Sequence, residues 1–373
     1  MMHKAFRILG LFSLLGFSSC HVSSKTALEG SGGRNAYNVV LQTSNSEQML
    51  LNLVRLRYYD SPFFLDVGTI TTQFTYKTSA MPTIPIPGFT KANPFSLGGE
   101  FSWQNQPTIQ YTPLEGQAFA HQILTPIDLR TIQQLILSGW DVELVFRLVI
   151  QSFDEFLNAP EASGPIPEYI PRYKNFREVA QLLHHFQVRS ALKVGVKTIV
   201  RKKGAEEGII PDDCCQVLQI AFPENDPEAE KLAGLFSEVQ KINGHYAINL
   251  ELGFNTRGQI GIIPRSILSC MYYLSSAIDV PQEDIDKKKV ATTKSFSGEV
   301  FDWGEIIGEL ITVHSSSRAP KECYVSVKYK DHWFYIDECD ILSKRTFLLL
   351  LQLYNLQAQE NKTLSPILAL PLG

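Results

Sequence analysis

The stretch SNSEQMLLNLVRLRYYDSPFFLDVGTITTQFTY, residues 44–76, holds a helix signal followed directly by a strand signal. Ser44 and Glu47 form a capping box, a pattern in which two side chains satisfy the first free amides of a helix. Apolar residues then recur at helical spacing: Met49, Leu50, Leu53, Val54 and Leu56. Pro62 cannot continue a helix, and residues 67–76 are rich in β-branched and aromatic types. This stretch therefore predicts a helix that ends near Asp60 and is followed directly by a strand.

The first half of the chain, residues 37–157, continues in the same mixed manner. Residues 79–94 are rich in proline and predict a loop or a hairpin tip. Residues 95–112 return as one or two strands, in which Phe101 and Trp103 alternate with polar residues. Residues 114–156 carry apolar stripes at helical spacing. The first half is thus expected to be a helix, a long hairpin and a helical segment.

A proline-rich segment at 158–173 predicts a linker, and an α+β region is expected over 174–373. That region includes a hairpin at 324–337, a buried helix that Ser343 caps, and a final edge strand in which Pro366 begins an apolar run. Strands and helices alternate without a regular βαβ rhythm, so the expected fold class is α+β, with amphipathic helices packed on antiparallel hairpins.

Cysteine usage leaves the disulfide pairing open. Apart from Cys20, the chain has Cys214, Cys215, Cys270, Cys323 and Cys339. Five cysteines cannot all pair within the chain, and free, partly buried thiols are the expected state. A two-residue turn at Lys330-Asp331 places Tyr329 opposite His332, so Cys323 faces Glu338, and Cys339 points to the other face. A three-residue turn would place the two cysteines opposite each other.

The N-terminus predicts an exported lipoprotein. Basic Lys4 and Arg7 precede the apolar run 8–17, which is too short to span a bilayer. Phe17-Ser-Ser-Cys20 is similar to the bacterial lipobox, so residues 1–19 are expected to be a signal peptide and Cys20 to carry lipid, palmitate included. The alternative is ordinary cleavage that leaves Cys20 as a thiol.

The next segment, 20–36, is a Gly/Ser-rich tether that would let the folded body clear the lipid headgroups. His21 stands where an acidic residue favours inner-membrane retention in lipoproteins, so by this resemblance the expected location is the outer membrane, facing the periplasm. The membrane is thus a partner through the lipid, and an envelope protein is a further candidate.

Composition and motifs give no catalytic assignment. A hydrophobic content of 44% fits a globular core, and a net charge of −4 gives no field suited to nucleic acid. Dinucleotide, phosphate-loop, zinc-protease and serine-hydrolase motifs are absent from the sequence, so neither a cofactor nor a metal is assigned. Adjacent His184 and His185 point about 100° apart on a helix and cannot easily share one metal. Whether the chain is an enzyme stays open, with a preference against.

Four charged residues near the first helix form a candidate site. Arg55 and Arg57 are two positions apart, so at least one of them lies toward the apolar side of the helix. A guanidinium there needs a carboxylate, and Asp60 and Asp66 are the nearest in sequence. The first interpretation is a buried ion pair with Arg57, and the second is a site for an anionic ligand.

Two stretches resemble an uncharacterised family of lipoproteins of Gram-negative bacteria. One is residues 52–67, NLVRLRYYDSPFFLDV, and the other is residues 324–337, YVSVKYKDHWFYID, together with SKRTF at 343–347 and the final LPLG. The family has no established activity, so the resemblance implies the location and no catalytic residue.

Three functions remain. The preferred hypothesis is a non-enzymatic scaffold or assembly component of the envelope. The second is an envelope hydrolase or glycan-binding enzyme. The third is an oligomeric outer-membrane export component, in which the hairpins 63–112 of several subunits join.

Overall fold

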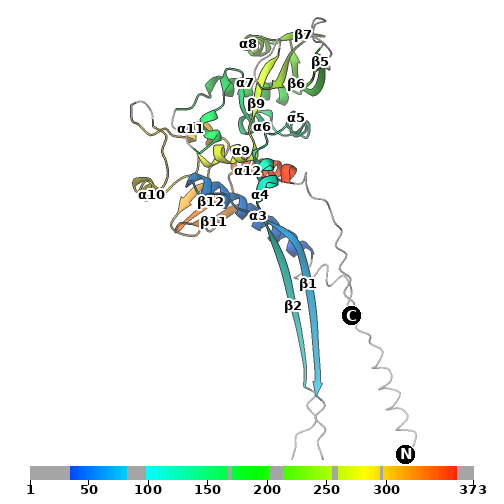
Figure 1. Ribbon diagram of the computed structural model, residues 1–373, viewed down its shortest axis with the longest axis vertical. Helices are drawn as coiled ribbons and strands as arrows, with labels where there is room; N and C mark the ends of the chain where they lie inside the picture. Colours follow the sequence, from blue (N-terminus) through cyan, green and yellow to red (C-terminus); the bar gives the residue numbers. More distant parts are fainter. Residues whose placement is uncertain are drawn as a thin grey trace, which may run out of the picture. The chain divides into compact units, whose positions relative to one another are not determined.

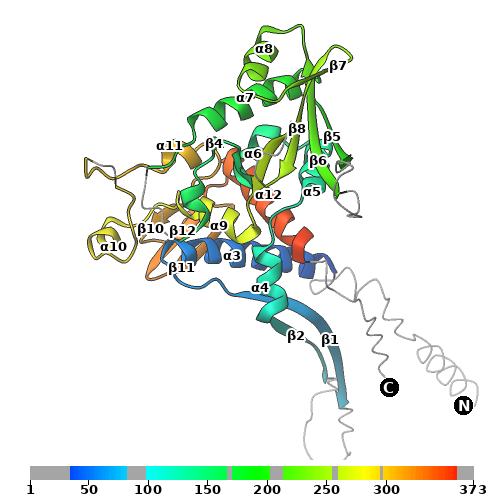
Figure 2. The ribbon, with the colours of Figure 1, turned by 45° about the horizontal axis from the view of Figure 1, so that its top comes forward.

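The computed structural model describes residues 34–81, 98–165, 170–201, 213–253, 259–294 and 297–358. The expected signal peptide, Cys20, most of the tether and of the loop 79–94, and the final edge strand lie outside these residues. The fold is α+β, as expected (Figures 1 and 2). Contacts divide the chain into two compact units: unit 1 is Met1–Asn45 with Leu65–Thr112, and unit 2 is Ser46–Phe64 with Pro113–Gly373.

A two-stranded sheet accounts for most of the described part of unit 1. It pairs β1 (Phe64–Met81) with β2 (Gly98–Leu114), and the two strands run side by side in opposite directions in both views (Figures 1 and 2). The helix before it, α3 (Arg34–Arg57), begins well before the expected cap. Ser44 is therefore an interior residue of α3, because residues 34–43 contain neither Gly nor Pro to stop the helix.

The larger sheet belongs to unit 2 and has the order β4-β3-β9-β8-β6-β5, with β7 paired to β8. Its neighbours are antiparallel except for β8 and β9, which are parallel. Its strands are β3 (Ile150–Phe153), β4 (Phe156–Leu157), β5 (Lys193–Arg201), β6 (Asp213–Pro223), β7 (Gln240–Ile242), β8 (His245–Leu252) and β9 (Ile260–Pro264). The expected helical region 114–156 thus ends in strands, because α6 stops at Val149 and β-branched Ile150 begins β3.

Unit 2 also contains the remaining helices, and several of them begin at an acidic or hydroxyl cap. Asp128, Asp141, Asp226 and Ser266 each accept a hydrogen bond from a backbone amide of the first turn. The helices are α4 (Gly116–Leu124), α5 (Leu129–Leu137), α6 (Val142–Val149), α7 (Lys174–Val188), α8 (Pro227–Gly234), α9 (Ile267–Ser275), α10 (Gln282–Asp286), α11 (Gly304–Ile307) and α12 (Ile341–Ala358). No helix among the described residues is long and apolar enough to cross a membrane.

A second sheet in unit 2 has the order β10-β12-β11, from β10 (His314–Ser316), β11 (Val325–Tyr329) and β12 (His332–Ile336). Tyr329 pairs with His332, which confirms the two-residue turn. Both turn residues have positive φ, 43° at Lys330 and 70° at Asp331, as a type I′ hairpin requires. Cys270, Cys323 and Cys339 are free thiols, and the side chains of Cys214 and Cys215 lie outside the described part.

The segment after β4 is packed in unit 2, although the proline pattern predicts a linker there. Asn158, Ala159 and Ala162 are buried. The fully buried guanidinium of Arg265 donates to carbonyl oxygens of this segment and of the chain around β3: Arg147, Leu148, Ile150, Asn158 and Ala159. It also lies 4.0 Å from the ring centroid of Tyr273. The division between the units therefore falls at the β1–β2 sheet and not at 158–173.

Candidate functional site

A buried carboxylate lies at the C-terminal end of α3. The Tyr58 hydroxyl donates to Asp284 Oδ2 over 2.7 Å, and Lys289 Nζ lies 2.5 Å from Asp284 Oδ1. Asp284 has no exposed surface, although Lys289 reaches solvent. Asp284 belongs to α10, and Tyr58 directly follows α3. The hydrogen bond between them therefore joins two segments that are far apart in the sequence.

A second aspartate next to it has the same kind of partners. Lys330 Nζ lies 2.8 Å from Asp60 Oδ2, and the Tyr329 hydroxyl donates to the same oxygen. The ammonium of Lys330 is also 4.7 Å from the Tyr58 ring centroid. The rings of Tyr58 and Tyr329 meet edge to face at 5.6 Å, so the two groups form one assembly. We call Tyr58, Asp60, Asp284, Lys289, Tyr329 and Lys330 the tyrosine–aspartate cluster.

The electrostatics of this cluster favour stable pairing over proton transfer. Burial and the Asp284 hydrogen bond raise the pKa of Tyr58, and burial with the Asp60 hydrogen bond raises that of Tyr329 to about 12. Burial acts to raise the pKa of Asp284, but hydrogen bonds from Lys289 and Tyr58 outweigh it and hold that pKa below its usual value. Both phenols therefore stay protonated as donors near neutral pH, and two carboxylates balance two ammonium groups.

The four residues singled out in the sequence do not form one site. Asp60 belongs to the tyrosine–aspartate cluster, and its carboxylate is bound by Lys330 and Tyr329 and not by Arg57. Arg57 Nη1 donates instead to the Ala291 carbonyl over 3.0 Å, and burial lowers the pKa of Arg57. Arg55 donates to Asn52 Oδ1 over 3.3 Å. Asp66 belongs to unit 1, so the structure does not place it against Arg57.

The histidines and the other acidic residues considered as candidate catalytic or metal-binding groups are paired with carboxylates or with backbone amides. His184 and His185 lie 2.9 and 3.0 Å from two different carboxylates, those of Asp141 and Glu228. His332 Nε2 is 3.4 Å from Glu283. Asp337 and Asp340 accept hydrogen bonds from the backbone amides of Cys339 and Ser343 at the start of α12. Across the described ranges, no three His, Cys, Asp or Glu side chains are grouped as metal ligands.

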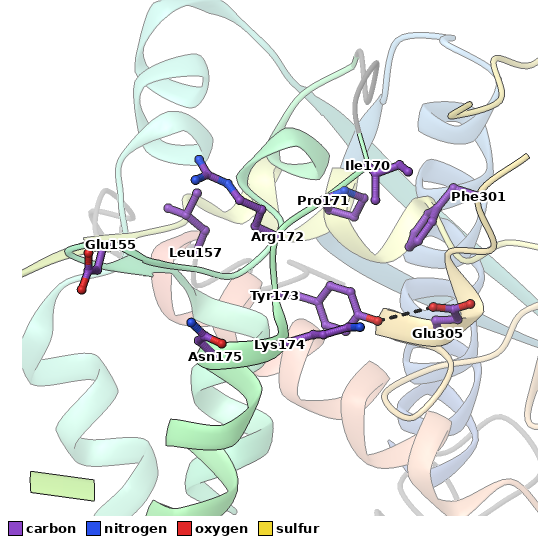
Figure 3. Close-up of a pocket in the computed structure, with 10 residues that line it drawn as sticks. All are labelled: Glu155, Leu157, Ile170, Pro171, Arg172, Tyr173, Lys174, Asn175, Phe301 and Glu305. Atoms are coloured by element: carbon purple, nitrogen blue, oxygen red, sulfur yellow. Dashed lines mark hydrogen bonds between the residues drawn. The ribbon is translucent and has the colours of Figure 1, made fainter. Parts of the chain in front are cut away.

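A cavity of about 510 Å³ opens between β4, the start of α7 and α11 (Figure 3). Its lining residues are Glu155, Leu157, Ile170, Pro171, Arg172, Tyr173, Lys174, Asn175, Phe301 and Glu305. The Tyr173 hydroxyl donates to Glu305 Oε2 over 3.4 Å, and the Arg177 guanidinium lies 5.0 Å from the Tyr173 ring centroid. This lining includes no Ser, Cys or His, and its ionisable side chains are those of Glu155, Arg172, Tyr173, Lys174 and Glu305.

The roots of the β1–β2 sheet are fixed in unit 2. Asn52 is fully buried, and its side chain both donates to the Phe63 carbonyl and accepts from the Phe63 amide, each over 2.9 Å. Phe64, the first residue of β1, is 1% exposed and stacks on Tyr354 with centroids 4.9 Å apart. Leu114, the last residue of β2, packs against the core of unit 2. The first residue of β1 and the last residue of β2 are thus both packed in unit 2.

Beyond these roots, the two strands present free edges. Within the described residues, β1 and β2 pair with each other and with no further strand. In an antiparallel pair, every second residue directs its amide and carbonyl away from the partner strand. The outer edges of β1 and β2 are therefore two rows of hydrogen-bonding groups that another strand can occupy.

Searches for a matching protein family, for a similar characterised protein and for a similar solved structure find no match.

Proposed function

We propose that this protein is a lipid-anchored envelope lipoprotein that works as a non-enzymatic assembly component and joins other chains through the outer edges of its β1–β2 sheet. The anchor and the location rest on the sequence, namely the apolar run 8–17, Cys20 and the tether that follows. The sheet carries the assembly role.

The observation that carries the proposal is that, in the part of the chain that the structure describes, this sheet has two strands of unusual length. β1 has 18 residues and β2 has 17, so at about 3.3 Å per residue each extends for roughly 55–60 Å. Strands of globular proteins usually have about 5–6 residues, and an isolated two-stranded ribbon is marginally stable in water. A third strand or a packed helix normally supplies the missing stability. We infer that another chain supplies it here.

The structure around the roots supports a mechanical role. Asn52, Phe64 and Leu114 hold both strand ends in unit 2, and the tyrosine–aspartate cluster fastens the turn after α3 to α10 and to the β11–β12 hairpin. The residues of unit 2 from which the two strands start are therefore held by packed elements.

The test is affinity purification of the intact protein from its native envelope, compared with a variant in which residues 69–108 are replaced by a short Gly-Ser turn. We expect the intact chain to retain associated chains in fixed ratio and the shortened chain to lose them, while both unfold at the same denaturant midpoint. Equal recovery of the same chains by both variants would contradict the role of the sheet.

The alternative, a hydrolase or glycan-binding enzyme, would use the cavity beside Tyr173. Its walls combine the aromatic rings of Tyr173 and Phe301 with polar groups, a combination that suits a ligand with both apolar and polar parts. Binding of cell-wall glycan fragments that Tyr173→Ala abolishes, with the shortened sheet still binding them, would favour this alternative.

A further inference from the structure

We infer that the chain that pairs with the β1–β2 sheet is a second copy of the same protein, with the outer edge of β1 in one copy joined to the outer edge of β2 in the next. This inference rests on the proposed function and names its partner. It concerns the backbone edges, so it needs no particular side chain within the sheet.

The first argument is the match between the two edges. β1 and β2 differ by one residue in length, 18 against 17. They run in opposite directions (Figure 1). A neighbouring β2 placed beside β1 therefore continues the same antiparallel alternation, and the two edges cover each other from root to tip. A short strand from an unrelated partner would leave most of either edge uncovered.

The second argument concerns how many edges remain. Each copy has two different outer edges. A two-fold contact that pairs β1 with β1 leaves both β2 edges open, and a contact that pairs β2 with β2 leaves both β1 edges open. Head-to-tail pairing of β1 with β2 uses one kind of contact and covers both edges of each copy once the assembly closes into a ring. Repetition of a single chain is thus the simplest arrangement that leaves no open edge.

The third argument is that β1 and β2 contain few of the residues that prevent a free strand edge from pairing with another strand. Proteins protect a free edge with lysines, prolines or bulges. β1 contains Asp66 and Lys77 as its only charged residues and contains no proline. β2 contains Glu100 as its only charged residue, and Pro107 is its only proline away from the end at Pro113. Pro107 removes one donor from an edge of 17 residues, which weakens pairing locally without preventing it.

The root geometry fits such a contact. Gly68 near the start of β1 lies across from Thr112 near the end of β2, since a Cβ at Gly68 would be 3.6 Å from Thr112 Oγ1. The sheet is therefore paired from its first residues.

The experiment uses the full-length protein, extracted in detergent from cells that make it with its signal peptide. Its molar mass is measured by light scattering, and a photo-reactive benzophenone residue is placed at position 75 in β1 or, separately, at position 106 in β2. Mixed expression of isotope-labelled and unlabelled chains distinguishes cross-links between copies from those within one copy. We expect a mass that is a multiple of the chain mass, with position 75 of one copy cross-linked to β2 of another, and position 106 to β1.

Two adjacent threonines provide a matched control. The amides of Thr71 and Thr72 face opposite sides of β1, so a proline at one site removes a bond within the hairpin and at the other removes a bond of the outer edge only. Because one proline weakens pairing only locally, each variant carries three, at positions 71, 73 and 75 or at positions 72, 74 and 76. The set that lies on the outer edge should lower the mass to that of a single chain while the pairing of Gly68 with Thr112, reported by a cross-link, persists. If both variants stay assembled, the inference is wrong.

The remaining outcomes separate the inference from the proposed function. A single-chain mass together with stoichiometric recovery of a different protein, lost on removal of residues 69–108, would overturn the second copy and leave the assembly role standing. A single-chain mass with no associated protein would overturn both. Cross-links from β1 only to β1 would replace the head-to-tail contact by a two-fold one and would also overturn the inference.

Discussion

Removal of the Asn52 side chain should loosen the root of β1. Asn52→Ala deletes two hydrogen bonds of 2.9 Å to the backbone of Phe63. A buried amide or carbonyl that loses its hydrogen-bond partner costs about 1–3 kcal/mol. Because water can reach part of the Phe63 backbone, the lower half of that range applies, and the total loss in unfolding free energy is about 2–4 kcal/mol.

The assay is denaturant unfolding followed by tryptophan fluorescence, with Asn45→Ala as the control. Asn45 lies on the exposed side of the same helix, α3, so it reports the gain in helix propensity from Asn to Ala, which is a few tenths of a kcal/mol. Asn52→Ala should unfold at a clearly lower midpoint and Asn45→Ala at or slightly above the wild-type midpoint. A loss below about 1 kcal/mol for Asn52→Ala would show that the Phe63 backbone is solvated and that Asn52 does not hold the root.

Three further predictions address the anchor, the tyrosine–aspartate cluster and Arg57. Cys20→Ala should abolish labelling by a radioactive fatty acid and release the protein from membranes or leave it uncleaved, and unchanged labelling would refute lipidation. Because the folded pKa of Asp284 is lowered, its pairing contributes stability that is full above the ordinary carboxyl pKa near 4 and is lost as the pH falls through the folded pKa. Asp284→Asn should therefore flatten the acid limb of a stability profile. It should also remove the contribution of Lys289 to the alkaline limb, since the hydrogen bond to Asp284 is the main cause of the raised Lys289 pKa, and an unchanged acid limb would count against the pairing. Arg57→Ala should cost about 1–3 kcal/mol through its bond to the Ala291 carbonyl, more than Arg55→Ala, and equal denaturant midpoints for the two variants would contradict the difference.

The sequence was informative where a local pattern determines the backbone. The sequence around Lys330-Asp331 predicts the hairpin and leaves its turn length open, and the structure selects the two-residue turn. The end of α3 near Asp60 follows from the Pro62 signal. The predicted start of α3 at Ser44 was wrong, because a local pattern did not determine the backbone there. A capping box at Ser44 is a local preference, and a continuous helix before it overrides that preference.

The site was less accessible from the sequence, since its contacts are long-range. Arg57 and Asp60 lie close in sequence, which suggested a pair, but Asp60 is nearer in space to Lys330, 270 positions away along the chain. Nothing local marks Asp284 as buried, because an acid before Lys287–Lys289 has the pattern of a solvated loop. The apolar residues within 324–337 indicate a buried hairpin. A tyrosine in such a hairpin usually donates a hydrogen bond, which is the one signal in the sequence that pointed to Tyr329.

Amide hydrogen exchange along β1 and β2, measured on the lipid-anchored protein in native envelope vesicles, tests the assembly role most directly. In a sheet that is joined on both sides, the amides that face outward and those that face inward are both hydrogen-bonded, so neighbouring residues such as Thr71 and Thr72 should exchange slowly alike. In a free two-stranded sheet, every second amide of each strand faces water. Fast exchange at one of the two threonines and at every second residue beyond it would show that no other chain covers the edges, and would contradict the assembly role.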